Sequence, residues 1–401
     1  MIHFSNYRPK LIPYLGTVDP TSLARVQSID PTVSLNREKI EELGRDGAVG
    51  YKKGIPNVTV RMTQYEHGNM EIYKLLANKP LSTQTLTLSD FRISMVDLLA
   101  YLQKDDGSML GTVWYPKVRI SGFGINIGSP DAMIERTFDL VGEGFKILQG
   151  DNRYLIYKSH TVTSDEVPTV TITLDDPVPV ANPDTGEYML RVLRVRAGET
   201  KELDSSEYSY SESTNELTVS NVEENDVIRI LYSASSYISG EEYFELNSTD
   251  PVVISADSVS IYLVSGEYIH RLQSVTIDVA FEREDQKEIG SSEVVLRGIK
   301  SQTVTVSLGR LLETWSIEEA MRDKPTGYGI IDVQQFKDNM GLVVKIYDNS
   351  LKQNFRYGIK VTGLSPTELR NGASVGNYTG ADNTLEGSSL ILTEDETVLG
   401  V

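Results

Sequence analysis

The chain has 401 residues, of which 39% are hydrophobic and 24% charged, and a formal net charge of −19. At this length we expect two or three soluble, globular domains, because single hydrophobic cores stop growing at about 250–300 residues. The lack of cysteine excludes disulfides and thiolate metal sites, and the acidic balance disfavours tight, sequence-reading binding of nucleic acids.

The N-terminal stretch MIHFSNYRPKLIPYLG contains no basic patch followed by an apolar run. No later window approaches the roughly 18 consecutive apolar residues that a membrane-spanning helix requires. We therefore expect neither export nor membrane insertion.

Strands and one helix are predicted in the first 157 residues. RVQSIDPTVS from Arg25 and NVTVRM from Asn57 alternate between apolar and polar residues, as half-buried strands do. The mixed-charge stretch Leu35–Gly54 between them is predicted to be a loop. NMEIYKLLANKP, from Asn69, is typical of a short helix, with Asn69 as its cap and Lys79-Pro80 as its end.

A hairpin with its turn at Asp106-Gly107 should follow, and it leads into the strands VRISG, from Val118, and VGEGFKIL, from Val141. The stretch GFGINIG, from Gly122, superficially resembles a phosphate-binding loop. No clear helix follows to supply the positive end of a dipole, so a glycine-rich strand end is favoured.

Residues 158–237 have a different pattern. The short alternating strands TVTITL, YMLRVLRV, ELTVS and VIRILYSA are separated by polar turns. This strand spacing over about 80 residues predicts an immunoglobulin-like β-sandwich. The segment has a net charge of −9, against +1 for residues 1–157 and −11 for residues 238–401, which indicates a well-solvated outer module.

Part of the N-terminal sequence is repeated near the C-terminus. Residues 25–61 align without a gap on residues 271–307, so that equivalent residues lie 246 positions apart, as Arg25 and Arg271 do. Of these 37 pairs, 12 are identical. The identical pairs are Arg25/Arg271, Gln27/Gln273, Ser28/Ser274, Val33/Val279, Arg37/Arg283, Glu38/Glu284, Glu42/Glu288, Gly44/Gly290, Val49/Val295, Val58/Val304, Thr59/Thr305 and Val60/Val306.

Later elements recur in the same order. SIEEAMRDKP, from Ser316, predicts a second short helix; a turn at Asp348-Asn349 predicts a second hairpin; and IKVTG, from Ile359, matches VRISG. EGSSLILT, from Glu386, matches VGEGFKIL. We therefore predict a mainly β chain with two copies of one domain, the first copy (1–157) and the second copy (238–401), and the sandwich module (158–237) between them.

Both copies keep the same charged side chains in their long loops. The candidate contact residues are Arg37, Glu38, Glu42 and Arg45 in the first copy and Arg283, Glu284 and Glu288 in the second. One interpretation is a solvated loop whose charges give solubility. The other is docking on a neighbouring subunit through complementary ion pairs, which fix orientation and register.

The chain offers little for catalysis. Its histidines, at positions 3, 67, 160 and 270, are scattered and form no metal-binding spacing. There is no nucleophile elbow, and a Ser/His/Asp triad is hard to place. We expect no enzyme activity, no cofactor and no metal site.

The run RVQSIDPTVSLNREKIEELGRDGAVGYKKGIPNVTVRM, followed by a short helix and a V.ISG strand, resembles the major tail protein, or tail tube protein, of long-tailed bacteriophages. The resemblance covers roughly residues 1–157 and again 238–401. It implies, for each copy, a β-sandwich or partly closed barrel with one helix, packed into rings that stack as a hollow tube. Members of this family usually contribute one such fold per subunit and six subunits per ring, whereas this chain has two copies.

Three chains would then suffice for a ring, giving a trimer with pseudo-sixfold symmetry. The resemblance implies a virion protein, made in the host cytoplasm, whose partners are further copies of itself, other tail proteins (tape measure, terminator and tip) and DNA. The DNA would pass through the lumen during ejection without sequence-specific binding. A virion adhesin or baseplate-type β-protein that binds cell-surface glycans is the alternative function, and a carboxylate glycosidase is a distant third.

Overall fold

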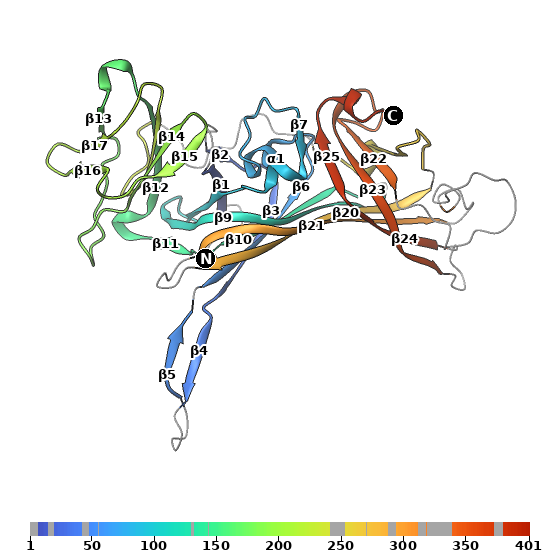
Figure 1. The fold of residues 1–401 in the computed structure, drawn as a ribbon, viewed down its shortest axis with the longest axis horizontal. Coiled ribbons are helices and arrows are strands. Elements are labelled where there is room, and N and C mark those ends of the chain that lie inside the picture. The colour runs from blue at the N-terminus through green and yellow to red at the C-terminus, as the bar shows by residue number, and fades with distance from the viewer. Residues whose placement is uncertain are drawn as a thin grey trace, which may run out of the picture.

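The computed structural model describes residues 7–14, 20–41, 48–54, 56–129, 132–142, 144–240, 253–269, 271–287, 294–311, 318, 339–372 and 380–401. The protein is mainly β, with 61% of the described residues in strands and 7% in helices, which confirms the predicted fold class. Most strands belong to one large antiparallel sheet system, which runs along the length of the molecule (Figure 1). Among the described residues, no helix is both long enough and apolar enough to cross a membrane.

The first copy surrounds its single α-helix with strands. Its elements are β1 (Tyr7–Pro13), β2 (Thr21–Ser22), β3 (Val26–Ser34), β4 (Arg37–Glu41), β5 (Ala48–Lys53), β6 (Asn57–Tyr65), α1 (Glu71–Leu76), β7 (Thr85–Thr87), the 3-10 helix η2 (Leu88–Phe91), β8 (Val96–Gln103), β9 (Met109–Ile127), β10 (Glu135–Gly142) and β11 (Lys146–Leu148).

The helix α1 is shorter than predicted. Its cap position is Met70, which has no side-chain capping bond, and the predicted cap Asn69 instead offers its carbonyl oxygen to Arg136 at 2.8 Å. Burial of Ile72, Tyr73, Leu75 and Leu76 stabilises the helix more than its cap does. It ends before Asn78, whose φ of +53° lies in the left-handed region.

The second copy repeats the strands of the first. Its elements are β19 (Val259–Leu263), β20 (Leu272–Lys287), β21 (Val294–Leu311), β22 (Met340–Tyr347), β23 (Phe355–Gly372), β24 (Gly380–Gly387) and β25 (Ser389–Thr393). The predicted second helix, from Ser316, lies outside the described residues except for Glu318, whose carboxylate pairs with Arg310.

Strand pairing is the same in both copies. In the first copy the order β3-β6-β10-β9 continues to β8 and β1, and β11 pairs with β9. In the second copy β20-β21-β24-β23 continues to β22 and β19, and β25 pairs with β23. One topology is therefore used twice. Both predicted hairpin turns, at Asp106-Gly107 and Asp348-Asn349, join the expected strands.

The short sequence match between Val118–Gly122 and Ile359–Gly363 is wrong in register. The structural counterpart of Val118 in the second copy is Leu364. Val118 lies against Gly142, which ends β10, and Leu364 lies against Gly387, which ends β24. Each also follows a residue with positive φ. Apolar alternation looks similar after a shift, so it cannot set the register by itself.

The segment between the copies folds into two sheets around its own core. Its strands are β12 (Tyr154–Thr161), β13 (Thr169–Thr173), β14 (Leu190–Arg196), β15 (Glu199–Glu202), β16 (Tyr208–Ser211), β17 (Glu216–Ser220) and β18 (Val227–Ala234). The sheets are β12-β18-β14-β15 and β13-β17-β16. The first strand pairs with the last, whereas in immunoglobulin domains the first pairs with the second, so this strand order differs from that of an immunoglobulin domain.

The sandwich module is fixed to the first copy. Because β12 begins at Tyr154, the predicted boundary between residues 157 and 158 falls inside this strand. Arg191 of β14 is buried and donates to Asp97 of β8 at 2.6 Å. Glu202 of β15 accepts from Tyr14 at 2.8 Å and lies 2.6 Å from Lys117. A shared apolar cluster lies around these polar contacts, so the module is a docked lobe at one end of the molecule (Figure 1).

Candidate assembly interface

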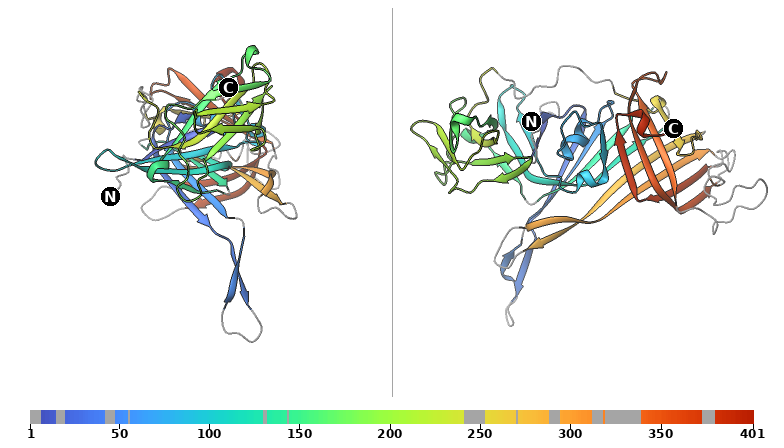
Figure 2. Two further views of the ribbon diagram at one scale, coloured as in Figure 1. Left: turned by 90° about the vertical axis from the view of Figure 1, so that its left-hand side faces the viewer. Right: turned by 45° about the horizontal axis from the view of Figure 1, so that its top comes forward.

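Within the chain, the two copies meet edge to edge. Strand β9 pairs antiparallel with β20, from Ile127 opposite Val275 to Gly122 opposite Ala280. The two sets of strands thereby form one continuous sheet, β3-β6-β10-β9-β20-β21-β24-β23. Figure 2 shows this sheet passing from the first copy into the second. The junction satisfies backbone groups that would otherwise be exposed on two strand edges.

Aromatic side chains pack beneath the junction. Phe123 of β9 and Phe281 of β20 are each only 3% exposed, and Phe91 is fully buried. The ring centroid of Phe281 lies 6.0 Å from that of Phe91 and 6.2 Å from that of Phe123. These residues belong to one hydrophobic cluster that includes residues of both copies. The copies therefore share a core as well as a sheet.

The glycines of GFGINIG are needed at this junction. A Cβ on Gly122 would lie 2.8 Å from the backbone carbonyl oxygen of Val279, on the facing strand. A Cβ on Gly124 would collide with the side chains of Asp278 and Thr137. The glycines allow β20 to approach β9 closely, as expected for a glycine-containing strand. This stretch lies in a strand and forms no phosphate-binding loop.

Arg283 is the predicted contact residue that contacts the other copy. It extends from β20 across the first copy, where its Nε donates to the carbonyl oxygen of Ile120 at 2.6 Å. Its Nη2 donates to the carbonyl of Phe91 at 3.2 Å, and Nη1 to that of Arg92 at 3.4 Å. The planar guanidinium group thus bridges several backbone acceptors. These contacts lie within one chain, so docking on a neighbouring subunit stays a prediction.

The other predicted contact residues do not converge. Glu284 is exposed, and so are Arg37 and Glu38 in β4. Glu38 lies 3.7 Å from Lys52 of β5 in an exposed ion pair, which contributes little to stability. The remaining predicted residues lie outside those whose side chains the structure describes: Glu42, Arg45 and Glu288.

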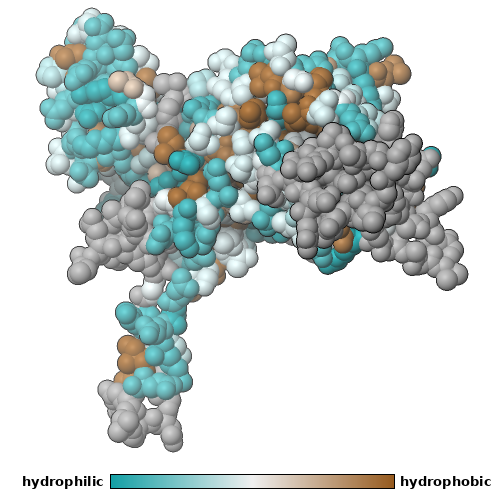
Figure 3. Space-filling view, turned by 45° about the vertical axis from the view of Figure 1, so that its right-hand side comes forward, coloured by the Kyte–Doolittle hydropathy of each residue, from teal (hydrophilic) through white to brown (hydrophobic). Residues whose placement is uncertain are grey.

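The stretches predicted as charged loops are two-stranded ribbons. In the first copy, β4 and β5 form an arm that extends away from the molecule (Figure 1). Apolar side chains lie exposed on it among charged ones, with Ile40 at 47% and Val49 at 43% exposed (Figure 3). In the second copy, the far ends of β20 and β21 form the equivalent ribbon without a break. Backbone pairing stabilises both, which a charge pattern alone did not indicate.

Residues retained in both copies explain the backbone at the start of β3 and β20. Arg25 and Arg271 both have φ of +58°. Their carbonyl oxygens accept hydrogen bonds from the last residues of β6 and β21, at 3.2 Å and 3.1 Å. A β-bulge follows in each copy, at Gln27 and at Gln273. Several of the identities thus preserve a local turn and bulge.

A buried polar cluster also joins the copies. Glu66, after β6, faces Arg136 of β10 at 3.4 Å, and both side chains are fully buried. The hydroxyl of Tyr357 of β23 donates to the same carboxylate. Burial and the nearby carboxylate raise the pKa of Tyr357 well above its usual value. No sequence pattern indicated this cluster, because its members lie far apart along the chain.

The exposed face of the shared sheet is polar and mainly acidic. Over the junction this face is hollowed, with a volume of about 750 Å³. Asp139 lies 3.7 Å from Arg61 there, and burial together with Asp139 raises the pKa of Asp278 against the opposing effect of Arg61. The charged side chains that point to this face from paired strands are Asp30, Arg61, Glu135, Asp139, Asp278, Glu282, Glu368, Arg370, Asp382 and Glu386.

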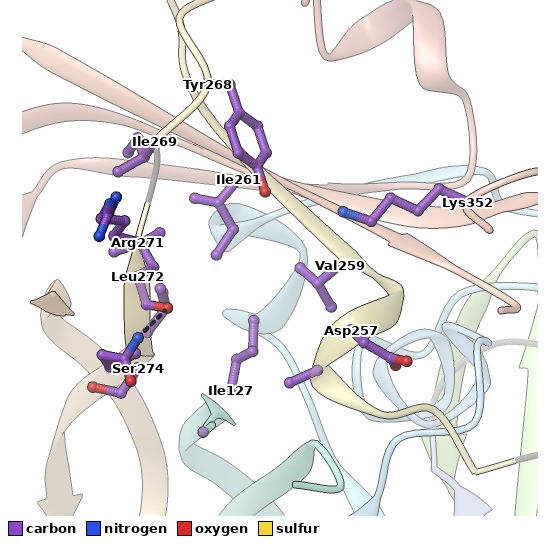
Figure 4. Close-up of a pocket in the computed structure, with 14 residues that line it drawn as sticks. Ile127, Asp257, Val259, Ile261, Tyr268, Ile269, Arg271, Leu272, Ser274 and Lys352 are labelled. Atoms are coloured by element: carbon purple, nitrogen blue, oxygen red, sulfur yellow. Dashed lines mark hydrogen bonds between the residues drawn. The ribbon is translucent and has the colours of Figure 1, made fainter. Parts of the chain in front are cut away.

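A smaller pocket of about 200 Å³ opens beside the junction, between the start of β20 and β19 (Figure 4). Its apolar wall includes Val259 and Ile261, and Arg271 and Lys352 stand on opposite sides of it (Figure 4). Within the described part of the chain, no three His, Asp or Glu side chains gather as metal ligands.

Among the described residues, each outer strand of the shared sheet has one edge without a paired strand. Within that part of the chain, strand β3, the counterpart of β20, pairs only with β6. The sheet portion of β23, the counterpart of β9, pairs there only with β24 among the residues that the structure describes. The chain therefore presents, at its two ends, the counterparts of the two edges that are joined in its middle, with Glu368 and Arg370 in place of Gly122 and Gly124. This arrangement defines a mainly antiparallel β protein whose two copies are joined edge to edge within one chain.

Comparison with known proteins adds little. No family model matches the chain. No curated protein matches it either. Among solved structures, it is similar to a chain of the anti-feeding prophage baseplate, determined by cryo-EM and sixfold symmetrised, with a TM-score of 0.27 and 11% identity over 36% of this chain and 93% of that one. At this level of similarity the match carries no argument about function.

Proposed function

We propose that this protein is a structural subunit of a phage tail tube, which assembles into stacked rings around a lumen that conducts DNA. The observation that carries this proposal is the junction between β9 and β20, where two copies of one fold join edge to edge in a continuous sheet. The resemblance of residues 1–157 and 238–401 to tail tube proteins supports it.

Repetition of the internal junction between chains would close a ring. An interface that joins one surface to a different surface is heterologous, and it produces a closed ring when its rotation divides a full turn. If six tube folds complete the ring, three chains suffice, because each supplies two. The fused copies also arrive at high effective concentration, which favours assembly over six separate subunits.

The polar face of the sheet is suited to line the lumen, since the opposite face is covered by the core. Duplex DNA carries one negative charge per about 1.7 Å of its axis, so a basic wall would retain it. Acidic side chains outnumber basic ones on this face, with Asp139 and Asp278 among them. Such a wall would let DNA slide without sequence-specific contacts.

This role is structural and non-catalytic, and it places the protein in the virion with other tail proteins at the ends of the tube. The sandwich module would lie on the outer side, held in one orientation by the contacts of Arg191 and Glu202 with the first copy.

Negative-stain microscopy of the purified protein tests the proposal. Rings with a central hole, or tubes with a regular axial repeat, are the expected result, and an averaged cross-section should have six similar lobes with three protrusions. Discrete spikes without a lumen would instead favour the virion adhesin. Hydrolysis of a glycan, abolished by one carboxylate-to-amide substitution, would replace the structural role with a catalytic one.

A further inference from the structure

The arm β4–β5 has the same backbone register as the ribbon at the end of β20–β21. Glu38 faces Lys52 in the arm, and Glu284 faces Gly298 at the equivalent positions of the ribbon. The arm has an irregularity next to Glu41, and the ribbon has one at the equivalent position. The two ribbons are thus the same element, although only that of the second copy crosses a neighbouring domain.

The difference between them lies at the base. In the second copy, Glu282 accepts hydrogen bonds from Ser301 at 2.7 Å and from Lys300 at 3.1 Å, and the ladder continues into the ribbon. In the first copy Gly54 stands in place of Lys300 and Pro56 in place of Gln302, the residue after Ser301, and the ladder is interrupted between Ser34 and Arg37. Proline cannot donate to a ladder, and the amide of Gly54 donates to the carbonyl oxygen of Asn36 at 2.9 Å, so the base of the arm is a short irregular link between the sheet and the ribbon.

The arm also carries an exposed arginine. Arg37 is the counterpart of Arg283, and within the described part of the chain no hydrogen-bond or ion-pair partner of Arg37 is found. Arg283, by contrast, donates to three backbone carbonyls of the domain beside it. The domain that Arg37 would cross, if the internal junction repeats, is the second copy of another chain.

We propose that the arm of one chain docks on the second copy of a second chain, where Arg37 donates to the backbone carbonyl of Pro366. Pro366 faces Leu385 as Ile120 faces Leu140, so its carbonyl is the counterpart of the one that Arg283 contacts. This inference rests on the proposed function, which it deepens by naming the partner surface.

The same template fixes the strand register between chains. Strand β3 pairs with β23 of the second chain so that Thr32 faces Arg370, as Asp278 faces Gly124 in the internal junction. Both side chains are exposed in the single chain, with Arg370 at 72% exposure, which leaves the two edges accessible to each other. The arm would lie against the neighbour where the two edges pair.

Cysteine cross-linking tests the register, because the chain has no cysteine of its own. We expect Thr32→Cys combined with Arg370→Cys to link chains under mild oxidation, since facing Cα atoms fall within the 4.4–6.8 Å that a disulfide usually spans. The matched control is Ser28→Cys with Arg370→Cys, on the same face but about 13 Å away along the strand at roughly 3.3 Å per residue. Equal linking by both pairs, or linking by the control alone, would overturn the register.

Alanine substitutions test the arm. Arg37→Ala should weaken chain–chain association at least tenfold while hydrogen exchange within the single chain stays unchanged. Lys39→Ala, on the same exposed arm, should leave association within about twofold of the original. Arg283→Ala is expected to act differently, because it loosens the internal junction and speeds exchange in β9 and β20. Association of the Arg37→Ala protein at the original strength would refute the docking of the arm.

These experiments separate the inference from the function on which it rests. Rings or tubes that form without the Thr32–Arg370 link and without any effect of Arg37→Ala would leave the tube proposal standing and overturn this inference. Failure of the unmodified protein to form any ring or tube would overturn both.

Discussion

The shared core predicts that one aromatic side chain couples the stability of the two copies. Phe281 belongs to the second copy, yet its ring lies 6.0 Å from Phe91 and 6.2 Å from Phe123 of the first. With only 3% of the residue exposed, Phe281→Ala should cost about 3–5 kcal/mol through lost burial and the cavity that remains. The lost aromatic contacts are part of this figure.

Hydrogen exchange gives the most direct measurement, because it reports the opening of each strand separately. A loss of about 4 kcal/mol corresponds to a nearly thousandfold increase in the opening equilibrium, at roughly 1.4 kcal/mol per factor of ten. We expect amide exchange to accelerate in β9 of the first copy as well as in β20. The strands of the sandwich module, which has its own core, should exchange at their original rates.

The matched control is Phe145→Ala, because Phe145 is 40% exposed and its ring lies 5.5 Å from that of Tyr115 in the first copy, away from the aromatic cluster at the junction. This substitution should change stability by less than about 1 kcal/mol, as surface substitutions usually do. If Phe281→Ala accelerates exchange in β20 but leaves β9 unchanged, the copies do not share a cooperative core, and the argument from the junction fails.

Three further predictions concern contacts between the domains of one chain and association between chains. Burial raises the pKa of Glu202, but Arg191 and then Lys117 outweigh burial and hold this pKa below its usual value. The contribution of Glu202 to stability is therefore complete above about pH 4.5 and is lost as the pH falls. Glu202→Gln should abolish that part of the acid sensitivity of the contact between the sandwich module and the first copy, as measured by thermal melts at several pH values. Lys74, 5% exposed and 2.8 Å from Glu394, joins α1 to the end of β25, and Lys74→Ala should cost about 1.5–3 kcal/mol in urea unfolding. Pro31→Ile should strengthen association between chains, measured by sedimentation.

The sequence predicted the fold class, the repeat and most strand positions for physical reasons that remain visible in the structure. Alternation in residues 275–281 places Val275, Ile277, Val279 and Phe281 on the buried face. Arg25 and Arg271, which are identical in the two copies, both have positive φ. The repeat identified these residues, but their backbone conformation is visible only in the structure. Alternation between apolar and polar residues reports which face of a strand is buried. For that reason it predicted the positions of strands well, but their register and their pairing partners poorly.

The assembly interface was only partly predictable. Retention of Arg37 and Arg283 indicated docking, but local sequence could not say that Arg283 meets the other copy of its own chain while Arg37 remains exposed. The cluster of Glu66, Arg136 and Tyr357 depends on long-range pairing of β6, β10 and β23, for which a single sequence has no signal. The strand order of the sandwich module escaped prediction for the same reason.

Pro31 shows how duplication allowed the inner and outer junctions to diverge. Its counterpart is Ile277, which faces Ile125 in the internal junction. The carbonyl oxygen of Val279, two residues further on, points toward β9, and residues two apart in a strand direct their backbone groups to the same side. Pro31 therefore withholds an amide donor from the outer edge of β3, as prolines on edge strands do to limit uncontrolled pairing.

Restoring that donor should strengthen the outer junction. A hydrogen bond contributes about 0.5–1.5 kcal/mol net, so Pro31→Ile should lower the concentration needed for chain–chain association by about 2- to 13-fold. Thr32→Val changes the neighbouring residue without adding a donor, and it should leave that concentration nearly unchanged. Association of the Pro31→Ile protein at the original concentration would mean that β3 does not pair with another chain through this edge, because a strand joined in the register of β20 must use the amide at this position.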